Sequence, residues 1–543
     1  MTDDRSLDGL VSRRTLLAGS GAAALLLGAG GLLTACGGSS KSPTASKSPT
    51  PAGSRSSGAL ASPSGSIKPG AALQGIITQQ IPTSLDPLTN QATTSAWNSA
   101  PAHDWLEYYD SKNVLYASLA SKVTQVDSTH IQYELRPGVV FHNGEAVTAQ
   151  AVADLFAWVQ DKTNGAWLQP QFVGVTTKVV SATTLIVALP APNVSFRGVM
   201  ARLPIVPVSA AKQQALHPIG CGPYLFDNWV QGSDVSYKLN PAASNSSQLP
   251  ATIRINHFPS DATGTQNFQS GGSDFCFPAA LAQAGTLRSG ASAGGYDFAP
   301  LEQGVAYLFL NNKKGPFANP QVRKAVRLAI NRDLLVSSAF NGVGRPYFAL
   351  LPPDSPYFSS DLNYSRDVSQ AKSILKSANA GNITATIVTL NVGYFQTLAT
   401  LLKANLADIG INVTVQIQDT ASVIKRGLTT KDFDLLVLAD ALEPDPATLL
   451  NYYVASDGPR NGSQYSNPKV DQLLKSAGGE TDEATRKSDL QQAMKTVFID
   501  DTGIIPLCAE ALPALQRHSN FVPSVAASGG IAYWRWQDAR VYA

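Results

Sequence analysis

The sequence predicts an α/β protein in which helices flank a mixed sheet, with more than one lobe. Residues 384–390 are rich in β-branched side chains, apolar residues recur at helical spacing over 398–409, and residues 411–417 alternate strictly between apolar and polar. This strand, helix and strand form a βαβ unit, which places two strands parallel to each other. The chain also has 543 residues, more than one compact domain normally holds, so we expect two or more lobes.

The composition indicates a globular protein that is nearly neutral. Hydrophobic residues make up 44% of the chain and charged residues 15%, with 41 Lys and Arg against 39 Asp and Glu. Residues 1–66 carry six of the basic and three of the acidic side chains, so the remaining 477 residues carry 35 and 36. This balance argues against a nucleic-acid protein that relies on a basic surface and against a disordered polyelectrolyte.

The first half of the chain contains strands separated by turns, and one clear helix. Residues 131–135 alternate between apolar and polar side chains, which is typical of a half-buried strand. Thr148 precedes apolar residues that are spaced as one face of a helix over 151–159, so we expect Thr148 to be its N-cap. Gly and Pro residues at 220–224 predict a loop.

The second half of the chain has clearer boundaries. Asn319 and Pro320 are the types expected at the N-cap and first position of a helix, which must end before Gly342. Residues 433–439 are predicted to be a buried strand, followed by a polar, proline-containing loop at 440–446. Ligands of open α/β sheets bind at the carboxyl ends of strands, so we expect the functional site at this loop.

Residues 1–35 have the pattern of an export signal. Arg13 and Arg14 precede an apolar stretch that runs to Ala35, and this order of charge and apolar run is typical of such signals. A retained transmembrane helix is the alternative, because about 20 apolar residues span a bilayer. Residues 33–36 resemble the lipobox of bacterial lipoproteins, which favours cleavage and attachment of a lipid to the thiol of Cys36.

Residues 36–66 are predicted to be a flexible tether between the lipid anchor and the folded part. Twenty of the thirty residues at 37–66 are Gly, Ser or Pro, so the segment lacks the apolar groups that would offset the entropy cost of ordering. The arginine pair fits export of folded protein by the twin-arginine route and also an ordinary secretory signal. The sequence leaves this choice open.

Motifs for catalysis and for metal or phosphate binding are absent from the sequence. It has no nucleophile elbow, phosphate-binding loop, dinucleotide fingerprint or His-Glu-x-x-His motif, and its six histidines are dispersed. We therefore expect no cofactor, no metal and a binding role rather than an enzyme, although catalytic triads can assemble from distant residues. Cys221, Cys276 and Cys508 leave two possibilities open: one disulfide with one thiol, or three buried thiols.

A series of short motifs follows in a fixed order along the chain beyond the tether. These motifs lie at residues 84–87, 133–139, 141–149, 220–224, 308–311, 316–317, 322–325, 329–332, 409–411 and 433–435. The clearest is the strand, turn and capped helix over 133–149. Together the motifs resemble the family 5 extracellular solute-binding proteins of ABC importers, the oligopeptide, dipeptide and nickel group.

The resemblance implies a two-lobed, hinged α/β fold of the periplasmic-binding-protein type, class II and similar in size to the large cluster C members. Lobe I would span residues 67–296 and lobe II residues 297–500, and residues 501–543 would return to lobe I. The solute would bind in the cleft between the lobes and be enclosed when they close, a hinge motion known for periplasmic binding proteins.

The resemblance also implies a function, a location and partners. The protein would be a monomer, lipid-anchored on the outer face of the cytoplasmic membrane, that captures a small solute, with a peptide favoured. It would deliver the solute to permease subunits whose ATPase subunits are separate chains. Two other functions stay open: a secreted hydrolase on the same anchor, and a family member recruited to sensing or adhesion.

The resemblance carries over to particular site residues. In peptide-binding members of the family, a carboxylate just beyond the corresponding strand pairs with the α-amino group of the peptide, and Asp440 matches this position, with Glu443 following. The alternatives are that Asp440 tightens its own loop, or that Asp445 and Pro446 give the correct alignment.

The expected cleft wall departs from the family pattern. Members often carry a tryptophan at the end of this strand, where the present chain has residues 437–439, Val-Leu-Ala. The pocket for a solute side chain must therefore differ. The residues that would line the cleft instead, unless they belong to the core, are Tyr394, Phe395, Tyr452 and Tyr453.

Overall fold

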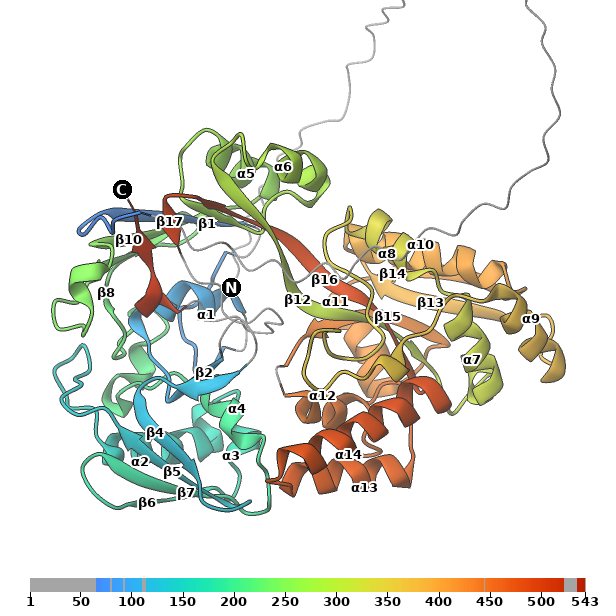
Figure 1. Cartoon of the computed structure of the whole chain (residues 1–543), viewed down its shortest axis with the longest axis horizontal. Helices are drawn as coiled ribbons and strands as arrows, with labels where there is room; N and C mark the ends of the chain where they lie inside the picture. The colour runs from blue at the N-terminus through green and yellow to red at the C-terminus, as the bar shows by residue number, and fades with distance from the viewer. Residues whose placement is uncertain are drawn as a thin grey trace, which may run out of the picture. The chain divides into compact units, whose positions relative to one another are not determined.

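The computed structural model describes most of the chain beyond the predicted tether (Figure 1). Contacts divide the chain into two units, residues 1–53 and 54–543, and every described residue belongs to the second. The described residues are 65–78, 81–90, 93–109, 114–443, 445–521 and 535–542. The predicted export signal, Cys36 and all but the last two residues of the predicted tether lie outside them. None of the helices in these six ranges is long and apolar enough to span a bilayer.

Ten of the described strands form one mixed sheet. Their order across the sheet is β14 (Asn412–Gln418), β13 (Thr384–Leu390), β15 (Leu435–Ala441), β12 (Tyr296–Leu310), β16 (Ile504–Arg517), β11 (Phe275–Phe277), β1 (Ala72–Thr78), β10 (Thr252–Phe258), β9 (Asp234–Leu239) and β8 (Tyr224–Val230). β13 is parallel to both β14 and β15, and β1 is parallel to both β10 and β11. The other neighbours are antiparallel, so the predicted mixed sheet and βαβ unit are confirmed.

The long strands β12 and β16 connect the two ends of this sheet (Figure 1). Residues 305–310 of β12 belong to the largest hydrophobic core, which the helices of the second half cover. From β16 this core takes Ile504, Ile505, Leu507, Cys508, Ala509 and Ala511. The other ends of the same strands contribute Tyr296 and Leu515 to a separate core cluster, and Ala514 to a third. The pairing is irregular between Glu302 and Gly304, which locally bends and twists such a strand pair.

A second, smaller sheet contains β4 (Ala120–Gln125), β5 (His130–Leu135), β7 (Thr184–Ala188) and β6 (Thr176–Val179). It packs with α2 (Ala149–Gln160) around a core of its own that extends from Leu88 to Ala211. Two short strand pairs complete the sheets, β2 (Glu107–Tyr109) with β3 (Leu115–Ala117) and β17 (Asn520–Phe521) with β18 (Arg540–Val541).

The sequence correctly predicts the starts of two helices. Thr148 accepts a hydrogen bond from the backbone of Ala151 at 3.1 Å, and Asn319 accepts one from Gln321 at 2.9 Å. The first of these helices is α2 and the second is α7 (Pro320–Ala329). The other described α-helices are α1 (Thr93–Ser99), α3 (Gln169–Phe172), α4 (Phe196–Met200), α5 (Asp261–Gln269), α6 (Ala284–Gly290), α8 (Arg332–Ala339), α9 (Val368–Ser377), α10 (Gly393–Ala407), α11 (Thr420–Ile424), α12 (Pro446–Tyr453), α13 (Pro468–Gly479) and α14 (Glu483–Lys495).

Two predicted boundaries differ from the structure. The helix predicted to end before Gly342 is divided into α7 and α8, because Ile330 has an extended backbone and the side chain of Asn331 caps α8. The strand predicted over 433–439 is β15, which lasts until Ala441, because Asp440 and Ala441 still pair with Val305 and Gly304 of β12. Asp440 therefore belongs to a strand and not to a loop.

Candidate functional site

The parallel strands β13 and β15 end at the same edge of the sheet. Beyond β13 the chain enters α10, whose second residue is Tyr394, while Asp440 lies in the last two residues of β15. Gly304 of β12 pairs with Ala441 on one side and with Glu510 of β16 on the other. The fold therefore brings Asp440, Tyr394 and Glu510 to the type of sheet edge at which α/β proteins bind ligands.

Asp440 is held by a cation and a phenol. One carboxylate oxygen lies 3.1 Å from Nη1 of Arg460, and the other accepts a hydrogen bond of 2.9 Å from the hydroxyl of Tyr307. The side chain of Asp440 is still 21% exposed. Since a carboxylate has about four acceptor positions, Asp440 can accept a further hydrogen bond from outside.

Two tyrosines beside Asp440 stay protonated. The pKa values of Tyr307 and Tyr453 are raised well above the ordinary value, first by burial and then by the negative charge of Asp440. The ring of Tyr453 also lies under the guanidinium of Arg460, 6.0 Å from its centre. These contacts fix the orientation of Asp440 before any ligand binds.

Glu443 and Asp445 follow β15, and each has an arginine partner. Glu443 lies 2.8 Å from Nη1 of Arg202, whose guanidinium stacks on the ring of Trp167. Burial raises the pKa of Glu443, and the nearby charge of Arg202 opposes that shift.

Asp445 serves the start of α12. It caps the helix by accepting a hydrogen bond of 2.9 Å from the backbone of Ala447, and both of its oxygens lie 2.8 Å from Nη2 of Arg486. Asp445 therefore has a structural role at the start of its own helix.

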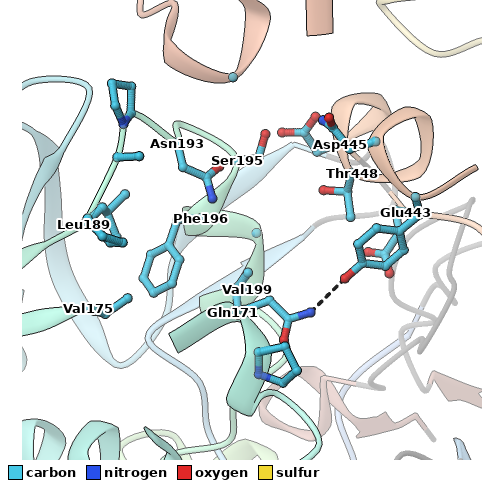
Figure 2. Close-up of a pocket in the computed structure, with 18 of the residues that line it drawn as sticks. Gln171, Val175, Leu189, Asn193, Ser195, Phe196, Val199, Glu443, Asp445 and Thr448 are labelled. Atoms are coloured by element: carbon cyan, nitrogen blue, oxygen red, sulfur yellow. Dashed lines mark hydrogen bonds between the residues drawn. The ribbon is translucent and has the colours of Figure 1, made fainter. Parts of the chain in front are cut away.

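A cavity of about 470 Å³ lies beside Glu443 and Asp445 (Figure 2). Its walls come from two parts of the chain with separate hydrophobic cores, residues 109–202 and residues 443–478. Nε2 of Gln171 donates a hydrogen bond of 2.7 Å to the hydroxyl of Tyr452 across the cavity. The apolar side chains of its wall include Val175, Leu189, Phe196 and Val199. The size and mostly apolar lining are typical of small-molecule sites.

Tyr394 and Glu510 form a second polar pair at the sheet edge. The hydroxyl of Tyr394 donates a hydrogen bond of 2.7 Å to Oε1 of Glu510. Burial is the main cause that raises the pKa of each group. Tyr394 is therefore a permanent donor that holds Glu510 in place.

The structure separates the six predicted ligand-binding residues into different surroundings. Asp440 lies beside Tyr453, Glu443 and Tyr452 line the cavity, and Tyr394 contacts Glu510. Phe395 and Tyr453 are only 3% and 2% exposed and belong to the main hydrophobic core. Phe395 contacts the ring of Tyr394 and packs against it.

The sequence pattern does not indicate the arginines that pair with these carboxylates, because Arg202 and Arg460 are distant in sequence from their partners. Glu510 was not predicted as a site residue, although the sequence contains a signal for it. Glu510 is the one charged residue in the otherwise apolar and small-residue stretch 504–515. A lone carboxylate inside a strand pattern of that kind is unusual.

The cysteines and histidines offer no second candidate site. Cys221, Cys276 and Cys508 are free thiols, of which Cys276 and Cys508 are buried and Cys221 is partly buried. The predicted alternative with a disulfide is therefore wrong. Burial raises the pKa of all three thiols, that of Cys276 to about 12, so they are poor nucleophiles. Within the described ranges, no group of three or more His, Cys, Asp or Glu side chains is arranged to hold a metal ion.

The family assignment rests on a match over most of the described chain. The model of the bacterial extracellular solute-binding proteins, family 5, matches residues 114–461. The chain belongs to this family. It is accordingly a substrate-binding protein of an ABC importer, which confirms the function predicted from the motifs. The family consists of binding proteins, consistent with the predicted binding role.

Relatives of this solute-binding protein include the glutathione-binding protein GsiB of several enterobacteria. GsiB of Shigella dysenteriae serotype 1 is 28% identical over 460 residues, which cover 80% of this chain and 88% of the relative. GsiB of Escherichia coli K12 is 27% identical with the same coverage.

Solved structures share the fold of this solute-binding protein. The substrate-binding protein CtaP of Listeria monocytogenes superposes with a TM-score of 0.78 at 18% identity, covering 88% of this chain and 100% of that structure. The murein tripeptide binding protein MppA of Escherichia coli gives a TM-score of 0.70 at 19% identity, with coverages of 88% and 99%. The oligopeptide-binding protein AppA of Bacillus subtilis, solved with a nonapeptide, gives 0.70 at 18%, with 87% and 100%. These likenesses confirm the predicted two-lobed binding-protein fold.

Proposed function

We propose that the solute is a small peptide whose amino group is bound by Asp440, and that the protein delivers this peptide to its permease. The observation that carries the proposal is the state of Asp440: it is fixed by Tyr307 and Arg460, yet partly exposed at the carboxyl end of β15. Proteins of similar sequence or fold bind glutathione, a murein tripeptide and a nonapeptide, which supports a peptide as the ligand class.

The physical basis is a charge-assisted hydrogen bond at a carboxylate that is largely shielded from water. Such a bond between a carboxylate and an ammonium group is roughly twice as strong as a neutral one. Hydrogen bonds to the peptide backbone would add affinity without selecting particular side chains. The ion pair with Arg460 reduces the net charge at Asp440, so the gain from one amino group is moderate.

The same proposal includes the location and organisation of the protein. Cys36 would carry the lipid that anchors a monomer to the outer face of the cytoplasmic membrane, and residues 36–66 would act as its tether. Residues 67–296 with 501–543 would form lobe I and residues 297–500 lobe II. The continuity of β12 and β16 between separate hydrophobic cores supports a hinge at these two strands.

Calorimetric titration of wild type and Asp440→Asn with trialanine and with N-acetyl-trialanine tests the amino-group assignment. We expect Asp440→Asn to weaken binding of trialanine about tenfold or more, which corresponds to about 1.4 kcal/mol, and binding of the acetylated peptide much less. Asp432→Asn, which removes the same charge from an exposed position, should bind both peptides like wild type. Equal losses for both peptides in Asp440→Asn would remove Asp440 from this role.

A further inference from the structure

We propose that Glu510 binds a second, positively charged group of the solute, so that the site selects cationic peptides over neutral ones. This inference rests on the proposed peptide-binding function and adds a specificity residue to it. The group would be an ammonium or a guanidinium, as carried by the side chains of lysine and arginine.

The charge partners of the neighbouring carboxylates set Glu510 apart. Four carboxylates near β12 and the end of β15 each have an arginine nitrogen within 3.1 Å: Glu302 with Arg345, Asp440 with Arg460, Glu443 with Arg202, and Asp445 with Arg486. Glu510 forms no ion pair with any described residue, and its hydrogen-bond partner is the neutral hydroxyl of Tyr394. The described residues therefore supply a counter-charge to each of these four carboxylates and none to Glu510.

The surroundings of Glu510 are unfavourable for a carboxylate that has no cation partner. Glu510 lies in the interior of β16, a strand inside a ten-stranded sheet, between Ala509 and Ala511, which are both fully buried. Glu510 itself remains partly accessible. A carboxylate in such surroundings loses hydration and is stabilised by a paired cation. The raised pKa of Glu510, caused mainly by burial, reflects this unfavourable state.

The geometry also prepares the carboxylate for a ligand. The hydroxyl of Tyr394 donates its hydrogen bond to Oε1 of Glu510, and the described residues make no hydrogen bond to Oε2. Oε2 lies beside Gly304, where an added Cβ would be only 2.8 Å from it and 2.5 Å from the backbone oxygen of Asp440. β12 lies between the strands that carry Glu510 and Asp440. Because residue 304 is a glycine, β12 has no side chain at this position between them. A solute with two positive groups can address the two carboxylates together.

The test combines two changes in the peptide with two changes in the protein. The probes are tripeptides of alanine with one lysine at the first, second or third position, the same peptides with norleucine in place of lysine, and the N-acetylated form of each. The proteins are wild type, Glu510→Gln, Asp440→Asn and the control Glu145→Gln, which removes a glutamate charge from an exposed loop position. Glutamine keeps an acceptor for Tyr394, and thermal unfolding without peptide checks that each variant is folded. Affinities come from calorimetry at pH 7.

For at least one lysine position, we expect wild type and Glu145→Gln to bind the lysine peptide about tenfold or more tightly than its norleucine counterpart. Glu510→Gln should lose this preference and still discriminate against acetylation, whereas Asp440→Asn should keep the lysine preference. Equal binding of lysine and norleucine peptides by wild type, or an unchanged preference in Glu510→Gln, would overturn the role of Glu510. If Glu510→Gln loses only the discrimination against acetylation, Glu510 binds the amino group and the second-charge proposal is wrong.

Failure of the proposed function gives a different pattern. If none of the peptides binds, arginine amide and spermidine are titrated as cations that are not peptides. If wild type binds one of these cations and Glu510→Gln does not, Glu510 is a cation site and the peptide proposal is wrong. If wild type binds neither cation, the role of Glu510 is wrong as well.

Discussion

His103 is a titratable residue inside the fold, 1% exposed, with its Nε2 atom 3.1 Å from Oε1 of Gln214. Burial lowers its pKa from 6.5 to about 4, and the neighbouring His142 acts in the same direction. The folded protein thus keeps this ring neutral at pH values where the unfolded chain protonates it. Two glycines, Gly220 and Gly222, let the backbone approach His103 closely enough to exclude water.

The stability of the protein should therefore fall on acidification. The contribution of His103 to the free energy of unfolding is complete above pH 6.5, the pKa of this side chain in the unfolded chain. It is lost progressively as the pH falls toward 4. Between pH 7.5 and 4.5 this loss is about 2–3 kcal/mol in the free energy of unfolding. Urea unfolding at both pH values measures it. His103→Gln should show a pH dependence smaller by that amount. An identical pH dependence in His103→Gln would contradict the account.

The roles of some individual residues could be predicted from the sequence, and those of others could not. Thr148 and Asn319 act as the caps that the sequence indicates, because capping depends on neighbours within a few residues. Arg460 and Arg202 were not foreseen as partners of Asp440 and Glu443, since such pairs are made by the tertiary fold. Their presence changes the site, because among the carboxylates near the end of β15 only Glu510 then lacks an arginine partner in the described part of the chain.

At the scale of elements, β12 determines where the site can form. Its pairing with β15 extends that strand to Ala441, two residues beyond the end predicted from the apolar run. Asp440 therefore lies in a fixed backbone. Hydrophobic pattern located β13, α10 and β15 within a few residues. It could not locate the end of β15, because that end depends on a partner strand more than a hundred residues earlier in the chain.

Gly304 of β12 should be intolerant of any side chain. An alanine Cβ there would lie 2.5 Å from the backbone oxygen of Asp440, so β15 would have to move. We expect Gly304→Ala to lower the free energy of unfolding by about 1–3 kcal/mol, as for other overpacked sites. Gly393→Ala is the control: it meets no atom within 4 Å and lies at the start of α10. Equal effects of both substitutions in urea unfolding would show that the contact at Gly304 is not restrictive.

At the scale of the whole molecule, the sequence motifs were sufficient for the fold class and the family, because each motif is local. The order of the ten strands was not predictable, since β16 returns from the end of the chain to pair with β12 and β11. The cavity beside Glu443 depends on the same long-range arrangement: Arg202 with Glu443, Gln171 with Tyr452 and the backbone of Val194 with Gly478 join two separately cored parts of the chain.

Native mass spectrometry shows whether this protein binds a small peptide and leaves it chemically unchanged. Residues 67–543, purified and freed of bound solute by partial unfolding and refolding, are mixed with an equimolar set of tripeptides that includes those with one lysine. We expect complexes that contain one intact peptide per chain, and we expect lysine peptides to be enriched among them. The free peptides should be unchanged in mass after prolonged incubation. Absence of any complex, or the appearance of cleaved peptides, would contradict it.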